Sequence, residues 1–266
     1  MTKVIGLEDV DSTQIAARDL FEAGALEDGD CVVAKKQTAG RGRLGRSWLS
    51  PEGGLYVSMI TTRPCPAARA ARVTLATAAG IGDALEALAI DARIKWPNDL
   101  VLPVTGPEGK LGPFRKVGGV IVEVLRMSSD QNFVEACSLG IGINVRAPAG
   151  GFPADLALIA GSLTDVGFSG SIDDVLSAVR AYVPPALERA QLDFPGVLDT
   201  ITTRSATLGR IIDIDGKNGI ARAFDDDGAL LFLDENGNEH VIRAGDVWLS
   251  SNGDDVDIDI ATVDET

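Results

Sequence analysis

After about Thr203 the pattern of the sequence changes from mixed helical and extended segments to short apolar runs alone. These runs are separated by the turn sequences "DGKNG", "DDDG" and "ENGN". Short strands between glycine-rich turns are typical of a small antiparallel barrel. The sequence therefore predicts an α+β protein in which residues 1–202 form the larger domain, residues 203–250 form the barrel and residues 251–266 form an acidic tail.

The larger domain is expected to contain amphipathic helices. "DST" at 11–13 is a strong helix start, and an alanine-rich helix is expected over 66–88. "SIDDVLSAVRAYV" is expected to form a third, capped helix. It should end at Pro184 and Pro185, because proline disrupts a helix interior.

Extended segments alternate with these helices. Strands are expected over 30–36, 54–62 and 92–102, and a buried hairpin over 116–125 and 137–145. The strand at 92–102 is expected to break at Pro97. The segment 103–115 is rich in proline and glycine and is expected to be a loop.

Composition excludes several function classes. The formal net charge is -15 and the sequence pI is about 4.4, which argues against non-specific binding to nucleic acid or to anionic lipid. His240 is the single histidine, so histidine triads and multi-histidine metal sites are excluded within one chain. Cys31, Cys65 and Cys137 lack CxxC spacing and indicate free thiols in a reducing cytoplasm. With no signal sequence and no apolar run of membrane-spanning length, we expect a cytoplasmic protein without membrane attachment.

"QTAGRGRLGRSW", residues 37–48, concentrates Arg41, Arg43 and Arg46 among glycines and is called the Gly/Arg loop below. Three interpretations compete: a solvated loop, a nucleic-acid patch, which the net charge disfavours, and an anion-binding loop built from backbone N–H groups and arginines. It is not a Walker A loop, because no Gly-Lys-Ser/Thr follows. "GRGRLG" matches the letters of the dinucleotide fingerprint, but "RSWLSPEGG" cannot continue as the helix that this fingerprint requires.

Three further motifs decide between these interpretations. "KWPNDL", 95–100, places Asn98 and Asp99 at a turn that proline forces. "KVGGVIVE" places Lys116 at the mouth of a buried strand whose glycines open the backbone, and "GIGINV" ends in Asn144. Taken singly, these motifs also fit an ordinary turn, a solvated edge lysine and tight packing of a strand against a helix.

Taken together, "DST", "GRGRLGRSW", "KWPND", "KVGGVIVE" and "GIGIN" resemble the biotin–protein ligases in order and approximate spacing. The likeness covers roughly residues 4 to 250, and the C-terminal barrel resembles that family's SH3-like domain. It implies a mixed sheet with flanking helices, similar to class II aminoacyl-tRNA synthetases and lipoate ligases. The implied enzyme is a biotin–[biotin carboxyl carrier protein] ligase. It would form biotinyl-5′-AMP and pyrophosphate from biotin and ATP, and then transfer biotin to one lysine of a biotin carboxyl carrier domain.

The resemblance also implies the role of each site residue. The implied catalytic residues are Lys116, Arg43 and Asp99. The implied biotin-binding residues are Ser12, Thr13, Gln37, Gly40, Arg41, Lys116 and Gly119. The implied ATP- or adenylate-binding residues are Arg43, Arg46, Trp48, Asn98, Lys116 and Asn144. Mg²⁺ should accompany ATP, with protein ligands that the motifs do not name.

The resemblance leaves partners and alternatives to be tested. It implies a biotin-dependent carboxylase as the target and pairing of two copies through the sheet. Specific DNA binding is not expected, because the chain begins close to "DST" and leaves no room for the winged-helix domain of the ligase-repressors. One alternative is a lipoate or octanoate ligase, which separate assays with each acid would distinguish. The others are a non-catalytic biotin or adenylate sensor, which pyrophosphate release would exclude, and a nucleic-acid-binding module, which should show salt-sensitive binding.

Overall fold

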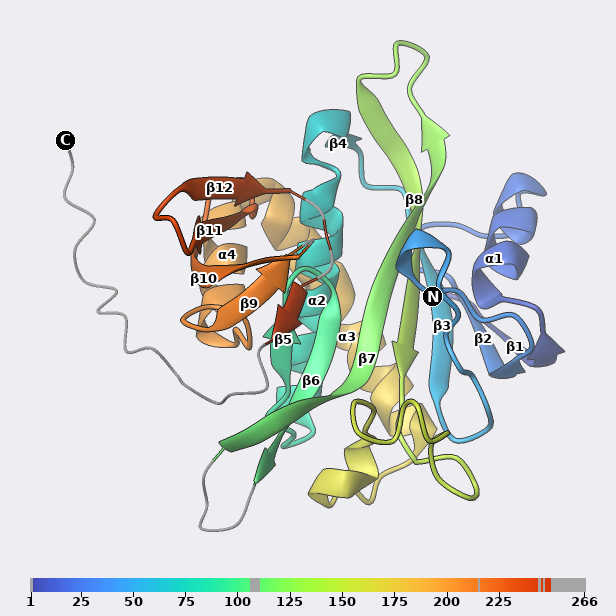
Figure 1. Cartoon of the computed structure of the whole chain (residues 1–266). Coiled ribbons are helices and arrows are strands. Elements are labelled where there is room, and N and C mark those ends of the chain that lie inside the picture. Colours follow the sequence, from blue (N-terminus) through green and yellow to red (C-terminus); the bar gives the residue numbers. More distant parts are fainter. Residues whose placement is uncertain (1, 106–110, 215, 244, 246, 250–266) are drawn as a thin grey trace.

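The computed structural model describes residues 2–105, 111–214, 216–243, 245 and 247–249 (Figure 1). The strands of its first sheet are β1 (Val4–Val10), β2 (Cys31–Gln37), β3 (Leu55–Thr61), β4 (Cys65–Pro66), β5 (Arg93–Lys95), β6 (Asp99–Thr105), β7 (Leu111–Met127) and β8 (Phe133–Ile143). The helices are α1 (Thr13–Glu22), α2 (Ala71–Ala87), α3 (Ile172–Leu192) and α4 (Phe194–Thr203), with 3-10 turns at Arg43–Gly45, Ala67–Arg69 and Leu163–Val166. The second sheet holds β9 (Ile211–Ile214), β10 (Lys217–Phe224), β11 (Leu230–Asp234), β12 (Glu239–Ile242) and β13 (Val247–Leu249). The predicted tail at 251–266 lies outside the described residues.

The first sheet is mixed, as predicted. Its strand order is β1-β2-β3-β8-β7-β6-β5, with β4 paired to β8. β1 and β2 are parallel and are joined through α1, while the other neighbours along this path are antiparallel. Ser12 caps α1, since its side chain accepts a hydrogen bond from the backbone N–H of Gln14. "DST" therefore starts a helix, as predicted.

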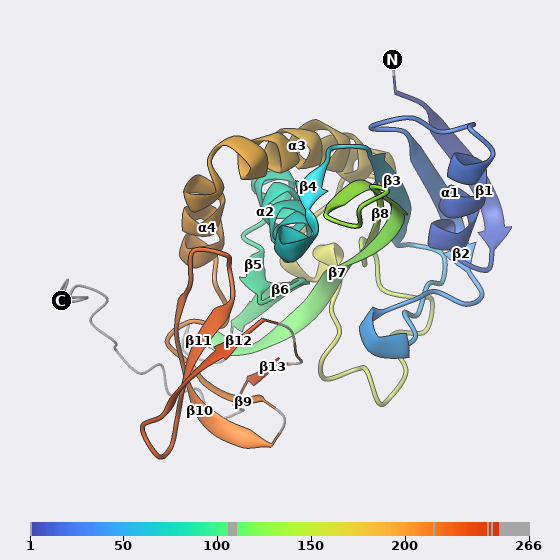
Figure 2. The ribbon, with the colours of Figure 1, turned by 90° about the horizontal axis from the view of Figure 1, so that it is seen from above.

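Helices cover both faces of this sheet, and the alternation of side chains along the strands decides which face each helix covers. Val32 and Ile60 pack in a small cluster with Ala17 of α1. Their strand neighbours Cys31 and Met59 point the other way, into the main core with α2, α3 and α4. Figure 2 shows α1 beside β1 and β2, apart from the group formed by α2, α3 and α4. The α1 face is also the face that carries the candidate site.

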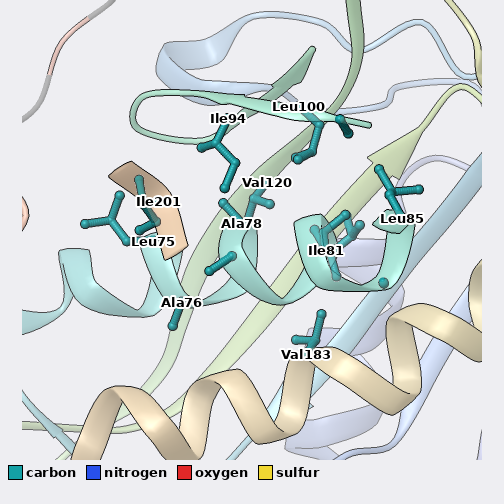
Figure 3. Close-up of a cluster of buried hydrophobic side chains, with 14 of the residues drawn as sticks. Leu75, Ala76, Ala78, Ile81, Leu85, Ile94, Leu100, Val120, Val183 and Ile201 are labelled. Atoms are coloured by element: carbon teal, nitrogen blue, oxygen red, sulfur yellow. The ribbon is translucent and has the colours of Figure 1, made fainter. Parts of the chain in front are cut away.

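The main core is built around α2, which lies between the sheet and α3. Figure 3 shows Ile81 and Leu85 of α2 pointing into this core, with Ile94 and Leu100 of the β5–β6 hairpin on one side and Val183 of α3 on the other. All five side chains are fully buried. At roughly 1.5–3 kcal/mol for each fully buried large aliphatic side chain, this layer is a main source of stability.

The second sheet is antiparallel, with the strand order β12-β11-β10-β9-β13. This confirms the all-β character predicted for the C-terminal part. Trp96, at the turn between β5 and β6, joins the two sheets: its indole N–H donates to the carbonyl oxygen of Gly228 at 2.9 Å. The backbone N–H of Trp96 donates to the hydroxyl of Thr207 at 2.9 Å. The Trp96–Pro97 peptide bond is cis.

One predicted helix end is wrong. α3 continues through Pro184 and Pro185 to Leu192, although each proline lacks the N–H that would bond four residues back. Pro185 is exposed and Pro184 is partly buried, whereas Val183 and Leu187 on either side are buried in the core. Burial of the helix face on α2 therefore outweighs the local preference to stop.

The predicted loop at 103–115 is also wrong at both ends. β6 extends to Thr105 and β7 begins at Leu111, so only part of the segment lies between strands. Pro103 is tolerated because β5 pairs with β6 only as far as Val101, which leaves one edge of β6 unpaired at the proline. Similarly, β7 pairs with β8 only from Gly118 onward, so one edge of β7 is unpaired before that residue. Proline is tolerated in a strand where such an edge is unpaired.

Two glycines of α2 give a matched test of the α2–α3 contact. A Cβ at Gly80 would lie 2.8 Å from the backbone Cα of Val183, whereas a Cβ at Gly82 would first meet a side-chain atom, Cδ of Arg204, at 3.1 Å. Both Gly→Ala changes gain about 1 kcal/mol of helix propensity. We expect Gly82→Ala to leave the free energy of unfolding within about 1 kcal/mol of the parent, and Gly80→Ala to lower it by about 1–3 kcal/mol through overpacking. Equal urea midpoints for the two variants would contradict this packing.

No helix in the described part of the chain is long and apolar enough to cross a membrane. Cys31, Cys65 and Cys137 are free thiols, as predicted. Burial raises the pKa of Cys31 to about 11 and that of Cys137 to about 12. At neutral pH these two thiols are therefore protonated, and they are poor nucleophiles.

Candidate active site

A cavity opens on the α1 face of the first sheet, beneath the Gly/Arg loop. It is bounded by the start of α1, the Gly/Arg loop, strands β6, β7 and β8, and strand β13 of the second sheet. Its lining residues are Ser12, Thr13, Gln14, Gln37, Arg41, Gly42, Arg43, Arg46, Ser47, Trp48, Lys95, Asn98, Asp99, Lys116, Gly119, Val120, Ile121, Gly140, Ile141, Gly142, Val247 and Trp248.

The centre of the cavity is one row of residues that runs across the sheet. The strand register places Asp99 of β6 opposite Gly119 of β7, and Gly119 opposite Gly142 of β8. Because directly paired residues of antiparallel strands project to the same face, the two glycines leave open space beside the Asp99 carboxylate. Lys116 fills part of this space, and its Nζ lies 2.6 Å from Asp99 Oδ1.

The glycines of "GIGIN" are required by side chains that lie over the strand. A Cβ at Gly142 would lie 2.7 Å from the Nε1 atom of Trp48, and a Cβ at Gly140 would lie 2.9 Å from the side chain of Gln14. Gln14 is buried and hydrogen-bonds to Ser138. Trp48 Nε1 is buried without a hydrogen-bond partner among the described residues, so this N–H can serve a ligand atom in the cavity.

The end of the cavity beside α1 is polar and tightly organised. The backbone N–H of Thr13 donates to Gln37 Oε1 at 2.8 Å, and Gln37 Nε2 donates to the Ser50 hydroxyl at 2.8 Å. The Ser58 hydroxyl donates to Thr13 Oγ1 at 2.9 Å. These bonds fix hydroxyl and amide groups on rigid elements, which suits recognition of a small polar ring system.

The Gly/Arg loop forms a compact turn over the cavity. The backbone N–H of Gly42 donates to the carbonyl oxygen of Arg46 at 2.7 Å, and Leu44 has a left-handed φ of 55°. Arg43 Nη1 donates to Asn98 Oδ1 at 2.9 Å. Asn98 in turn donates to the carbonyl oxygen of Val120 at 3.0 Å. Asn98 therefore connects the loop to the central strand.

Cations dominate the lining of the cavity. Arg41, Arg43, Arg46, Lys95 and Lys116 face a single carboxylate, Asp99, among the described residues that line it. Within a chain of net charge -15, this is a local concentration of positive charge in a partly enclosed site, where electrostatic interactions are stronger than in bulk water. The site is suited to bringing together two anionic substrates.

Most of the predicted site residues meet in this cavity. Eleven of them are in the lining: Ser12, Thr13, Gln37, Arg41, Arg43, Arg46, Trp48, Asn98, Asp99, Lys116 and Gly119. Gly40 and Asn144 are not. The carbonyl of Gly40 accepts the N–H of Trp48, and the side chain of Asn144 donates to the carbonyl of Gly161 at 3.0 Å. Both residues contribute to the fold beside the cavity.

Sequence reasoning missed several residues of the cavity. Gln14 directly follows "DST" and was given no role. Lys95 stands at the start of "KWPND", of which only Asn98 and Asp99 were predicted as site residues. Val247 and Trp248 come from the second sheet, and no signal in the sequence places β13 against a loop some 200 residues earlier.

Comparisons with known proteins identify the family of the chain. The sequence model of the biotin/lipoate A/B protein ligase family matches residues 6–144. A bifunctional ligase/repressor of Bacillus spizizenii is 33% identical over 248 residues, which cover 88% of this chain and 70% of that protein. A biotin–[acetyl-CoA-carboxylase] ligase of Paracoccus denitrificans is 32% identical over 256 residues, which cover 91% of this chain and 98% of that protein.

Solved structures show the same architecture. The biotin protein ligase of Aquifex aeolicus in complex with biotin and ATP aligns with a TM-score of 0.75 and 27% identity, covering 94% of this chain and 99% of that one. The shared fold extends over both sheets, since so little of either chain is left out. By sequence and by structure, the chain belongs to the biotin/lipoate A/B protein ligase family.

Proposed function

We propose that this chain is an ATP-dependent biotin–protein ligase. It forms biotinyl-5′-AMP and pyrophosphate, and then transfers biotin to a lysine of a biotin carboxyl carrier domain. The observation that carries the proposal is the Lys116–Asp99 pair, set in a cationic cavity beneath a glycine-rich loop. The names of the Paracoccus and Aquifex relatives, one an acetyl-CoA-carboxylase ligase and the other bound to biotin and ATP, support it.

In the first step an oxygen of the biotin carboxylate attacks the α-phosphorus of ATP. A bond forms between that oxygen and phosphorus, the bond to the bridging oxygen breaks, and pyrophosphate leaves. Lys116 is placed to neutralise both the carboxylate and the α-phosphoryl group, while Arg43 and Arg46 of the loop supply charge for the phosphates. Fixed cations aimed at developing negative charge are the main source of catalysis in such transfers.

In the second step the amine of the carrier lysine attacks the acyl carbon, and AMP leaves. An attacking lysine must first lose a proton, and Asp99 is the carboxylate within reach of the cavity centre. Its ion pair with Lys116 at 2.6 Å holds the carboxylate in one orientation. When Lys116 turns toward the substrate phosphate, Asp99 Oδ1 is released to face the incoming amine, while Asp99 Oδ2 stays 3.6 Å from Lys95 Nζ.

Biotin is expected at the polar end of the cavity. Ser12, Thr13 and Gln37 offer hydroxyl and amide groups for the ureido ring, which both donates and accepts hydrogen bonds. The glycine at 119 lets the acyl chain pass close to the backbone of β7. Trp48 is expected to lie against the adenylate, with its unpaired indole N–H available to an acceptor atom.

Mg²⁺ is expected to arrive with ATP. No group of three histidine, cysteine or carboxylate side chains among the described residues is arranged to hold a metal ion. This donor set fits a cation that is carried mainly by the phosphates and water, because Mg²⁺ commonly uses few protein ligands in nucleotide sites. Asp99 is the carboxylate of the cavity that could complete its shell.

The proposal is tested by pyrophosphate release from ATP with biotin, lipoate and octanoate in separate assays. Release with biotin alone is the expected result. Release with lipoate or octanoate instead would show that the substrate is one of these related acids. No release with any of the three acids, even when a carrier domain is added, would show that the protein binds ligands without catalysing adenylation.

Three predictions about partners and location accompany this function. We expect no non-specific DNA binding, because the net charge of -15 opposes contact with phosphates. We expect two copies to pair through the sheet, which light scattering can measure. We also expect the protein to act in the cytoplasm, where carboxylase carrier domains and ATP are present together.

Gly142→Ala tests the place of Trp48 in the site. The added methyl would lie 2.7 Å from Trp48 Nε1, so the indole must move away from the strand. We expect biotin-dependent adenylation to fall about tenfold, since small displacements of positioning groups are costly. Gly6→Ala on β1, where an added Cβ meets nothing within 4 Å, is the matched control. Equal rates of adenylation in the two variants would show that the position of Trp48 does not matter for the reaction.

A further inference from the structure

Trp248 is the feature of the cavity that the proposed function does not yet use. It lies on β13 of the second sheet, at the mouth of the cavity, and is 56% exposed, while its neighbour Val247 is fully buried. A large aromatic side chain left open to solvent at a cavity mouth commonly contributes to recognition.

Two cations from different parts of the chain approach this indole. The guanidinium carbon of Arg46, on the Gly/Arg loop, lies 5.9 Å from the ring centroid. Lys95 Nζ, at the end of β5, lies 5.8 Å from it. Both distances are within the range in which a ring face attracts a cation.

A third cation reaches the same segment through the backbone. Arg43 Nη1 donates to the carbonyl oxygen of Gly245 at 3.3 Å. Gly245 and Trp248 together therefore contact Arg43, Arg46 and Lys95, three of the cations that line the cavity. These cations come from two elements that are not hydrogen-bonded neighbours in the first sheet, so the second sheet is a common support for them.

We propose that Trp248 is a positioning residue for the phosphate chain of ATP: its indole holds Arg46 and Lys95 at the mouth of the cavity, facing the β- and γ-phosphates. This inference rests on the proposed function, because it assigns the mouth of that cavity to the triphosphate. An indole attracts a cation through its ring electrons without cancelling the charge. Lys95 Nζ also lies 3.6 Å from Asp99 Oδ2, so a phosphate at the mouth competes with that carboxylate for Lys95.

The experiment compares Trp248→Leu with Trp248→Phe. Leucine keeps apolar bulk without a ring, whereas phenylalanine keeps the ring face. Val241→Ala on β12, which is also exposed and belongs to the same sheet, is the matched control. ATP affinity is measured by calorimetry without biotin, and KM for ATP and for biotin are measured by pyrophosphate release.

We expect Trp248→Leu to weaken ATP binding about tenfold and to raise the KM for ATP similarly, as the loss of two cation–ring contacts implies. The KM for biotin should stay within about twofold, and Trp248→Phe should recover most of the ATP affinity. In an Arg46→Gln background, Trp248→Leu should have a smaller effect, because one of its two partners is already absent.

Wild-type ATP affinity in Trp248→Leu would overturn the inference, as would Trp248→Phe failing as badly as leucine. Equal rises in the KM values for ATP and biotin would do so too, because they would indicate a general structural role. The proposed function fails separately: a wild-type protein that binds ATP but releases pyrophosphate only with another acid is not a biotin ligase, while the calorimetric comparison still decides the role of Trp248.

Discussion

Lys116→Ala is expected to slow biotin-dependent adenylation by about 10²–10³, which corresponds to ~2.7–4 kcal/mol of lost transition-state stabilisation. The reason is its position. Lys116 Nζ lies 2.6 Å from Asp99 at the centre of the cavity, and 5.2 Å from the ring of Trp48. Lys95 is the register partner of Asp99 on β5, and its Nζ lies 3.6 Å from Asp99 Oδ2, farther than that of Lys116, so we expect it to compensate only in part. Single-turnover formation of biotinyl-5′-AMP measures the effect directly.

Lys35→Ala is the control for loss of a lysine. Lys35 lies on β2, is exposed and pairs with Glu8 at 2.8 Å, so its loss should leave adenylation unchanged. Lys116→Arg keeps the charge but changes its shape, and should retain part of the rate. Near-parental adenylation in Lys116→Ala would remove this residue from the catalytic set and leave the loop arginines to carry the step.

Trp96→Ala is expected to lower the free energy of unfolding by about 3–5 kcal/mol, the usual cost of removing a large aromatic side chain from a core. Trp96 is 2% exposed, and its indole N–H bonds to the carbonyl oxygen of Gly228 in the second sheet. Trp96→Phe keeps most of the packing and loses that bond, so it should cost about 1–3 kcal/mol. Urea unfolding followed by circular dichroism measures both.

Trp96→Ala and Trp96→Phe together distinguish the contribution of packing from that of the hydrogen bond where Trp96 connects the two sheets. If Trp96→Ala unfolds at the parental urea concentration, the indole cannot be a structural link. If the alanine variant does not fold at all, the phenylalanine variant still gives the value for the bond to Gly228. Activity should follow the same order, because the turn that holds Trp96 also holds Asp99.

Much of the fold is predictable from local chemistry. The serine of "DST" caps a helix because its hydroxyl accepts from the backbone two residues on. The β-branched runs around "KVGG" and "GIGIN" form paired strands, as their composition indicates. The glycines of "GIGIN" marked a place where other side chains approach the strand, here Gln14 and Trp48, but the roles of the site residues came from the resemblance and not from local chemistry.

The parts that failed depend on distant neighbours. In an isolated peptide, Pro184 and Pro185 would end a helix. In the protein, packing against α2 stabilises α3 through the two prolines, and the local sequence does not indicate this packing. Pro103 is accepted in β6 because β5 is short, which is a property of another segment. Trp248 belongs to the site only because β13 pairs with β9 near the Gly/Arg loop, and that proximity is set by the way the two sheets pack.

The connection that Trp96 makes between the two sheets has a consequence for protein engineering. The same short turn contacts Thr207 and Gly228 through Trp96 and presents Asn98 and Asp99 to the cavity. A graft of this cavity onto another scaffold therefore has to carry the strand at Val247–Leu249 and the hairpin around Gly228 with it. For the same reason, inserting or deleting one residue between Trp96 and Asp99 would shift the Asp99 carboxylate relative to the contacts that hold Trp96. The spacing between these two residues should therefore be kept unchanged in any design.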